Sequence, residues 1–272
     1  MAVIDSALRP TAVPAELLRA VVAYFRPRQV ILFGSHARGD AGGDSDIDLA
    51  VVLDDSAPAE HLSARAAHEA RAGFGRACDI VAWRASDFRG RAAVIGSLPH
   101  TVVLEGQVIF GERLDRRIAR TMTPDKADPV AQWAEARRWL QVADDDLRTV
   151  DACLGADPPV TATAAYHCQQ AAEKLLKALL VACARPTRKT HDLDELAREA
   201  GEALPQLAAQ ADSCRFMTRW NFAFRYPSAA DREPVPPAAA EVAAARNLLA
   251  RLRAAVAAVE PGRSEDDTAP SG

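Results

Sequence analysis

Hydrophobic and polar positions alternate in two different ways along the chain. In the first part, short runs rich in β-branched residues are interleaved with stretches in which apolar residues recur every three or four positions, as in an amphipathic helix. These patterns predict helices over 14–25 and 57–74, strands over 29–34, 46–53 and 77–83, and a turn at Gly106 with a short extended run within 101–112. Such alternation is typical of an α/β unit, in which helices cover a small sheet.

From about residue 130 the helical spacing continues without a convincing strand, which predicts an all-α bundle. On one of the long predicted helices, Glu173 and Lys177 have the i,i+4 spacing of an ion pair, and Lys174 is expected to share their exposed stripe. Thr190 or Asp192 is expected to cap the helix that follows. The long helices are predicted over 130–154, 161–184 and 237–260, and shorter ones over 192–201 and about 204–217.

A charged segment that contains two prolines separates the two patterns. The boundaries that we expect are 1–112 for the α/β domain, 113–129 for a linker, 130–260 for the helical bundle and 261–272 for a disordered, acidic tail. A chain of 272 residues is long enough for two ordinary domains, which usually have about 100–200 residues each.

Composition narrows the class of protein. The chain is 49% hydrophobic and 26% charged with a net charge of −4, so it has no general attraction for nucleic acid or membranes. It has no apolar run of the roughly 20 residues that span a bilayer, and its beginning lacks the basic-then-apolar order of a signal peptide. The five cysteines lie far apart with no CxxC pair, which favours reduced thiols. We expect a cytoplasmic protein without a membrane partner.

The stretch FGSHARGDAGGDSDIDL, residues 33–49, carries the clearest chemical signal. Gly34 and Ser35 directly follow a predicted strand, so a tight turn there can point backbone N–H groups and a hydroxyl at a phosphate. Asp46 and Asp48 are two residues apart on the next strand and therefore face the same side. Two carboxylates held this close call for a cation, and their hard oxygens suit Mg²⁺ bound to a triphosphate.

Asp79 is the candidate for a third carboxylate, because a lone acid inside the apolar run ACDIVAW, residues 77–83, is otherwise hard to justify. Together with Asp46 and Asp48 it would complete a site for two metal ions, which activate a nucleophile and stabilise a leaving pyrophosphate. Each feature taken alone is also compatible with an ordinary turn or with solvated acids. Their conjunction is much rarer and favours the site.

This conjunction of GS, ARG and SDIDL resembles the polymerase-beta-type nucleotidyltransferase superfamily, in particular its minimal nucleotidyltransferase (MNT) branch, over about residues 15–110. The resemblance implies a small mixed sheet that carries the acids, a two-ion Mg²⁺ site, and ATP or another NTP as substrate. The site residues that it implies are Asp46, Asp48 and Asp79 as catalytic metal ligands, and Gly34, Ser35 and Arg38 as nucleotide-binding residues. For Arg38, an ion pair with Asp40 or Asp44 is the alternative.

A second resemblance covers about residues 130–258. The motifs YHCQQAAEKLLKALL (166–180), THDLDEL (190–196) and RYP (225–227) resemble those of the HEPN domain. The chain is therefore similar to a single-chain MNT–HEPN fusion. Separate chains of these two kinds commonly form toxin–antitoxin pairs, in which the nucleotidyltransferase neutralises a HEPN ribonuclease, in some cases by adenylylating it.

Arg185 and His191 form the candidate HEPN site, because their separation fits the Arg–His spacing of the ribonuclease branch. That branch carries its motif on a late helix, whereas these two residues precede a predicted helix, so a fold-stabilising role is favoured for His191. Tyr166 and Tyr226 are conceivable acceptors for self-adenylylation. The basic loop 185–189 could instead serve as a lid over a nucleotide or a substrate.

We therefore expect an Mg²⁺-dependent nucleotidyltransferase that moves an adenylyl group from ATP to an acceptor hydroxyl on a protein, an RNA or a small molecule. The HEPN domain is expected to bind the acceptor or the nucleotide and to join two chains in a homodimer. The alternatives are a toxin–antitoxin-type fusion whose HEPN domain is an RNase, an aminoglycoside-type antibiotic adenylyltransferase, and a binding module with a vestigial site.

Overall fold

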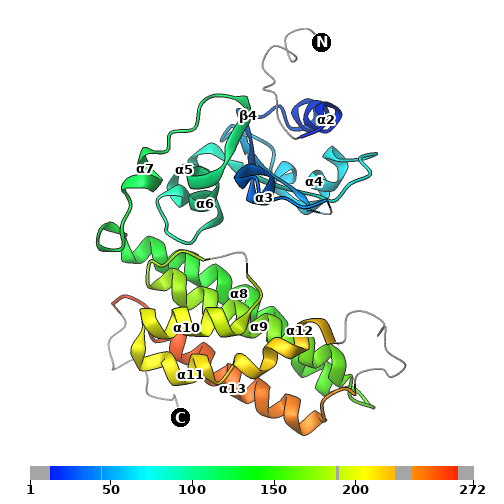
Figure 1. Ribbon diagram of the computed structural model, residues 1–272, viewed down its shortest axis with the longest axis vertical. Helices are drawn as coiled ribbons and strands as arrows, with labels where there is room; N and C mark the ends of the chain where they lie inside the picture. The colour runs from blue at the N-terminus through cyan, green and yellow to red at the C-terminus, as the bar shows by residue number, and fades with distance from the viewer. Residues whose placement is uncertain (1–12, 44, 188–189, 224–234, 263–272) are drawn as a thin grey trace. The chain divides into compact units, whose positions relative to one another are not determined.

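The structure is a computed structural model, and it describes residues 13–43, 45–187, 190–223 and 235–262. The chain divides into two compact units, Met1–Thr123 and Pro124–Gly272 (Figure 1). Four features named in the sequence analysis lie wholly or partly outside the described residues: Asp44, positions 188–189 of the basic loop 185–189, the RYP segment at 225–227 with its Tyr226, and positions 263–272 of the predicted tail.

The first unit contains a four-stranded mixed sheet. Strand β1 (Gln29–Phe33) lies between β2 (Ile47–Leu53) and β4 (Gln107–Gly111) and is antiparallel to both. Strand β3 (Cys78–Arg84) pairs in parallel with β2, so the order across the sheet is β3-β2-β1-β4. The small mixed sheet predicted for this part of the chain is confirmed.

Helices cover both faces of the sheet (Figure 1). On β2, the side chains of Ile47, Leu49 and Val51 join one core with α2 (Ala15–Phe25) and α4 (Ala64–Ala70). The alternate positions Ala50 and Val52 join a second core with α5 (Ala85–Ala92) and α6 (Leu98–Glu105). Because side chains alternate along a strand, Asp48 belongs to the face that α5 and α6 cover.

The structure corrects the prediction of one helix over 57–74. This stretch forms a 3₁₀ segment η1 (Ala59–Leu62) and the separate helix α4. Ser63 causes the break, because its hydroxyl donates to the Glu60 carbonyl at 2.6 Å and accepts from the Ala66 N–H at 3.2 Å, which caps a new helix.

Three helices of the first unit were not expected from the sequence. Helix α6 includes the β-branched run Thr101–Val103, which favours a strand by local preference, yet its packing in the second core makes it helical. Helix α5 carries a central Gly90, which weakens the helical signal. Helix α7 (Arg117–Thr121) falls in the segment predicted as a linker, which also contains η2 (Pro124–Lys126).

The second unit is entirely helical in the part that the structure describes, as predicted. Its long helices α8 (Pro129–Leu154), α9 (Thr161–Ala182) and α13 (Ala239–Ala257) bury their apolar faces in one common core. Asp192 caps α10 (Leu193–Ala203), since its carboxylate accepts the Asp194 N–H at 2.8 Å. The helix predicted over about 204–217 is broken into η3 (Pro205–Leu207), α11 (Ala208–Asp212) and η4 (Arg215–Arg219), which α12 (Trp220–Ala223) follows.

The predicted exposed stripe on α9 is wrong. Glu173 and Lys177 do form an ion pair, at 2.8 Å, but their exposures are only 6% and 7%. Lys174 is partly buried and contacts Asp146 of α8. The reason is that α9 packs against α8, α10 and α13 at once, so a stripe that would face solvent in an isolated hairpin lies inside the bundle.

Removing the Glu173 charge should make the stability of the protein less dependent on pH. Burial alone would raise the pKa of this carboxyl, but Lys177 and His191 outweigh it, so the pKa lies below its ordinary value of 4.5. Such a group stabilises the fold above its ordinary pKa, and this contribution is lost as the pH falls through the lowered folded-state pKa. Near neutral pH, Glu173→Gln should cost about 3 kcal/mol, because it leaves Lys177 buried without its partner.

Urea unfolding of the wild type and Glu173→Gln at a series of pH values checks this expectation. The difference in the free energy of unfolding should shrink as the pH is lowered past the ordinary carboxyl pKa, since the wild-type group then becomes neutral as well. A difference that stayed constant across the series would contradict the account.

Candidate active site

Three carboxylates gather at one end of the sheet. Asp48 is the second residue of β2 and lies in register with Asp79 on β3, so the two strands hold them side by side at about the 4.8 Å strand spacing. Asp46 comes just before β2, two residues from Asp48 and next to the end of the strand that carries it. The parallel pairing of β2 with β3 thus brings together acids that are far apart in the sequence.

The three acids differ in their exposure to solvent. Asp48 is 4% exposed, whereas Asp46 and Asp79 are exposed. Asp79 is tolerated within an apolar run because β3 is an edge strand and this position lies near its beginning. The neighbouring Cys78 points to the opposite face, where burial raises the pKa of its thiol to about 11, so this cysteine is not a nucleophile of the site.

A glycine turn brings the loop after β1 against the acids. Phe33 is the register partner of Asp48, and the next residue, Gly34, has φ +71° and begins the short helix α3 (Gly34–Arg38). A Cβ on Gly34 would overlap the Asp48 carboxylate. Glycine therefore meets two needs at once, a left-handed backbone and close approach to a buried acid. Ser35, which is half-buried, follows it in α3.

Arg38 is held by two carboxylates. Its Nε donates to Asp40 at 3.1 Å and its Nη1 to Glu105 Oε2, also at 3.1 Å. The contact with Asp40 is one of the two ion pairs considered from the sequence. Sequence reasoning missed Glu105, which lies 67 residues further along the chain and carries no local signal of this contact.

His36 closes the loop that leads to the acids. Its ring Nε2 lies 3.2 Å from the carbonyl oxygen of Ser45, and since a carbonyl only accepts, the ring donates. The Ser45 hydroxyl in turn accepts the Gly42 N–H at 2.9 Å. These contacts hold Ser45, the residue directly before Asp46.

The donor chemistry of this site fits a hard divalent cation shared with a nucleotide. Across 13–43, 45–187, 190–223 and 235–262, no three His, Cys, Asp or Glu side chains gather closely enough to hold a metal ion by themselves. Mg²⁺ is normally bound by one or two carboxylates together with substrate phosphates and water, and not by a complete protein cage. Asp46 and Asp48 are the residues that would hold such an ion.

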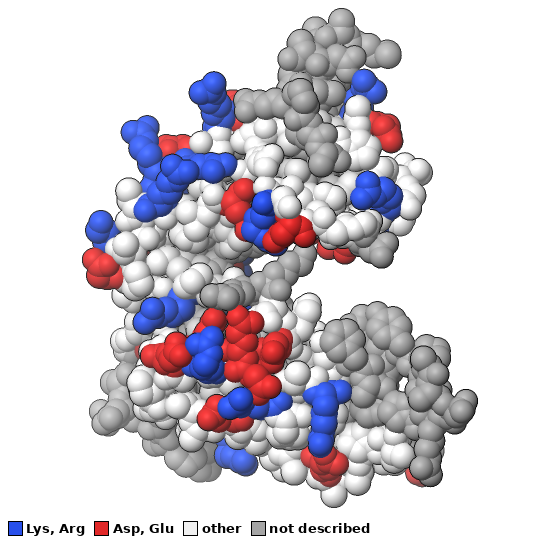
Figure 2. Space-filling view, in the orientation of Figure 1, with Lys and Arg blue, Asp and Glu red and all other residues white. Residues whose placement is uncertain are grey.

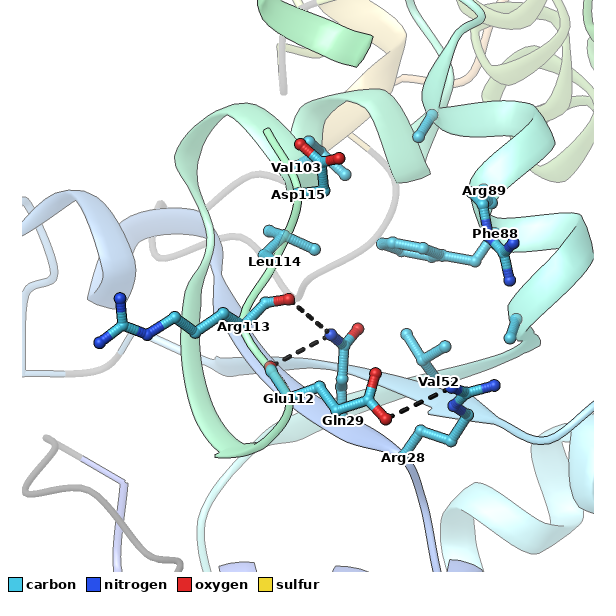
Figure 3. A pocket seen from close by; sticks show the side chains of 12 residues that line it. Arg28, Gln29, Val52, Phe88, Arg89, Val103, Glu112, Arg113, Leu114 and Asp115 are labelled. Atoms are coloured by element: carbon cyan, nitrogen blue, oxygen red, sulfur yellow. Dashed lines mark hydrogen bonds and ion pairs between the residues drawn. The ribbon is translucent and has the colours of Figure 1, made fainter. Parts of the chain in front are cut away.

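A cavity of about 310 Å³ lies on the same face of the sheet but at its other end (Figure 3). It is bordered by Gln29 and Val52, which pair four residues along from Phe33 and Asp48, a distance of about 13 Å. In Figure 3 the Phe88 ring points toward Leu114, and Gln29 donates to the carbonyls of residues 112 and 113 at 3.1 and 3.3 Å. This cavity is therefore separate from the three acids.

In the second unit, Arg185 and His191 are both exposed and lie between α9 and α10. His191 Nδ1 lies 3.0 Å from Glu173 Oε2, while Lys177 binds Glu173 Oε1 at 2.8 Å. The His191 carbonyl accepts from Gln169 at 3.3 Å. His191 is thus tied to α9 directly before the cap of α10, as a fold-stabilising residue would be.

Two further side chains of this unit, Arg185 and His167, lie beside acidic residues. Arg185 borders a cavity of about 220 Å³ together with Glu199 and Glu202. His167 Nδ1 contacts Asp146 at 2.8 Å and so joins α9 to α8. The role of Asp146 was not foreseen, because its partners His167 and Lys174 lie on another helix.

Comparison with protein families finds two matches. The model of the nucleotidyltransferase domain matches residues 15–97, which include Gly34, Asp48 and Asp79. The model of the HEPN domain matches residues 136–260. None of the curated proteins that were compared with the chain matches it. Among the residues that the structure describes, no helix has the length and apolar character needed to cross a membrane.

Proposed function

This chain is a nucleotidyltransferase that also carries a HEPN domain, and we propose that it transfers an adenylyl group from ATP to an acceptor hydroxyl with the help of Mg²⁺. The observation that supports this most is the placement of buried Asp48 between Gly34 and Asp79. In the proposed reaction the acceptor oxygen attacks the α-phosphorus, the bond to the β-phosphate oxygen breaks and pyrophosphate leaves. The hydroxyl proton passes to a base.

Each residue of the site has its own role in this proposal, either metal binding, proton transfer or phosphate binding. Asp46 and Asp48 would hold the metal ion, which would supply positive charge to the phosphates and to the acceptor oxygen. Asp79, exposed next to Asp48, would hold a second ion or accept the acceptor's proton. The Ser35 hydroxyl and the Arg38 guanidinium meet phosphate oxygens, and Gly34 supplies the tight turn that places them.

Incubation of the purified full chain with Mg²⁺ and α-labelled nucleotides tests the proposal. ATP, GTP, CTP and UTP are compared, because ATP as donor rests on the resemblance alone. Each is supplied alone, with total RNA, with cell extract or with an aminoglycoside, beside an Asp46→Ala/Asp48→Ala variant. Label that appears on one acceptor with the wild type, and not with the variant, supports transfer and identifies the acceptor class. Label on no acceptor with any nucleotide would overturn it.

The proposed assembly is a homodimer formed through the HEPN domain, which binds the acceptor. Light scattering on the purified full chain measures the mass directly. Twice the mass of the 29.1 kDa chain supports the dimer, and the mass of one chain contradicts it.

RNA cleavage by the HEPN domain, as in a toxin–antitoxin-type fusion, is the second candidate function. The contact between the exposed His191 and the buried Glu173 favours it, because a carboxylate that accepts the Nδ1–H leaves Nε2 as a base facing solvent. Against it stands the local charge. Figure 2 shows acidic side chains gathered over the α10 region with basic ones beside them, and acids repel an RNA backbone.

His191→Ala separates this candidate from the first. If the HEPN domain cleaves RNA with His191 as its base, the variant should cleave labelled RNA about 100-fold more slowly, while Asp46→Ala/Asp48→Ala cleaves at the wild-type rate. The matched control is His68→Ala, an exposed histidine of the other unit. RNA that stays intact with the wild type, or is shortened equally by His191→Ala, excludes this role.

A further inference from the structure

Glu105 makes contacts that point to a function in the candidate nucleotide site. It is the last residue of α6, and its Oε1 accepts the Gly34 N–H at 3.1 Å, across 71 positions of sequence. The same carboxylate accepts from Arg38 Nη1 with both oxygens, at 3.3 and 3.1 Å. One side chain thus holds both the turn that places Ser35 and the Arg38 guanidinium, which is proposed to meet the triphosphate.

The position of Glu105 is itself fixed by the junction between α6 and β4. A Cβ on the next residue, Gly106, would overlap the Val102 carbonyl oxygen, so the chain can turn here only with glycine. The Gly106 N–H donates to that same carbonyl at 2.9 Å, and Arg116 donates to the Gly106 carbonyl. Glu105 therefore extends from a rigid turn and not from a loose loop.

A second contact from the same junction holds the other part of α3. The Gln107 side chain donates to the Ala37 carbonyl at 2.6 Å. The short helix α3 is thus fixed at its first residue through Gly34, at its fourth through Ala37 and at its fifth through Arg38. All three contacts come from the two residues on either side of Gly106.

The charges around α3 give Glu105 a further task. Asp46, Asp48 and Asp79 lie at the end of the sheet beside α3, and each would attract a guanidinium. Arg38 is 40% exposed, and a guanidinium that turned toward these acids would compete with a metal ion for the same oxygens. A carboxylate that is only 21% exposed, with both oxygens on Arg38, keeps the guanidinium away from them.

From these contacts we propose that Glu105 is a positioning residue of the nucleotide site, which fixes the backbone turn at Gly34, directly before Ser35, and the Arg38 guanidinium, so that Ser35 and Arg38 can meet the triphosphate. The proposal rests on the nucleotidyl transfer proposed above and adds to it a residue outside the GS, ARG and SDIDL motifs. Glu105 acts through Gly34 and Arg38 and takes no part in the chemical step.

Hydrogen exchange of the full chain tests whether Glu105 holds the loop, independently of any activity. In Glu105→Ala the Gly34 amide loses its acceptor, so exchange in the peptide over residues 33–40 should become about tenfold faster. Glu105→Gln keeps an acceptor oxygen for Gly34 but loses the ion pair with Arg38. Its exchange rate should therefore lie between those of the wild type and Glu105→Ala. Unchanged exchange in Glu105→Ala overturns the proposal.

Nucleotide titration and the transfer assay test the consequence. Glu105→Ala should bind ATP with Mg²⁺ about tenfold more weakly and raise KM for ATP by the same factor, as expected for one lost charge-assisted hydrogen bond, and Glu105→Gln should again be intermediate. A merely structural role would lower the folded fraction and hence the apparent kcat, with KM unchanged. The matched control is Glu112→Gln, a carboxylate paired with Arg28 at the other end of β1.

The outcomes separate this inference from the proposed function. If the wild type binds ATP and Glu105→Ala binds it equally well, the role of Glu105 is overturned and the proposed function is not. Tighter binding by Glu105→Ala also overturns it, because the carboxylate would then occupy the place of a phosphate and be displaced by it. A wild-type protein that binds none of the four nucleotides overturns the proposed function and this role together.

Discussion

Replacement of Asp48 by asparagine should lower nucleotidyl transfer on the order of 1,000-fold while the protein stays folded. Asparagine has nearly the same shape as aspartate, so it fits the buried position beside Gly34. It lacks the negative charge that holds a divalent cation against the phosphates. Initial rates of label transfer from α-labelled ATP at saturating Mg²⁺ measure the effect, and thermal unfolding checks the fold.

Asp54→Asn is the matched control for this experiment. Asp54 follows the other end of β2, is 65% exposed and lies 3.7 Å from Arg28, so its charge is remote from the three acids. We expect this variant to transfer label at the wild-type rate. Full activity of Asp48→Asn, or an equal loss in both variants, would remove Asp48 from the proposed mechanism.

Replacement of Gly34 by alanine should be costly for both stability and activity. An alanine with φ +71° pays about 1–2 kcal/mol for the left-handed backbone, and the overlap of its methyl group with the Asp48 carboxylate adds about 1–3 kcal/mol. Relief of this overlap moves Asp48 or the loop. A displacement of about 1 Å in a catalytic site can lower the rate of transfer on the order of 100-fold. Chemical denaturation and the label-transfer assay measure the two effects.

Gly39→Ala separates crowding from backbone strain. Gly39 has φ +85°, but a Cβ there would have no atom within 4 Å, so only the backbone cost of about 1–2 kcal/mol is expected. Combining Gly34→Ala with Asp48→Ala should recover the part of the lost unfolding free energy that comes from the overlap. If Gly34→Ala costs no more than Gly39→Ala, or if the double variant recovers nothing, crowding by Asp48 is not the cause.

Several parts of the fold could be predicted because the relevant signals are local. The strands and long helices follow from the spacing of apolar residues, which reflects the period of the backbone itself. The helices α5 and α6 were missed for the opposite reason. Gly90 and the β-branched run Thr101–Val103 weaken the local helical signal, and only packing on the sheet selects the helix.

The same distinction holds for charged residues. From sequence, Glu173 and Lys177 are a surface pair four residues apart, and their separation is indeed as expected. Their burial depends on α8, α10 and α13, which surround α9, and the sequence of α9 contains no record of how many neighbours the helix will have. Exposure is therefore a property of the packing of several elements together.

For the candidate site, the sequence by itself determined the local features: a glycine–serine turn after a strand, and two carboxylates two residues apart. Those features depend on neighbours in the chain, for which strand alternation is enough. Only the tertiary structure decided that Asp79 lies in register with Asp48, and that Glu105 reaches Gly34 and Arg38. These contacts join segments far apart in sequence, and their partners are set by which strands pair and where a helix ends, which no local pattern specifies.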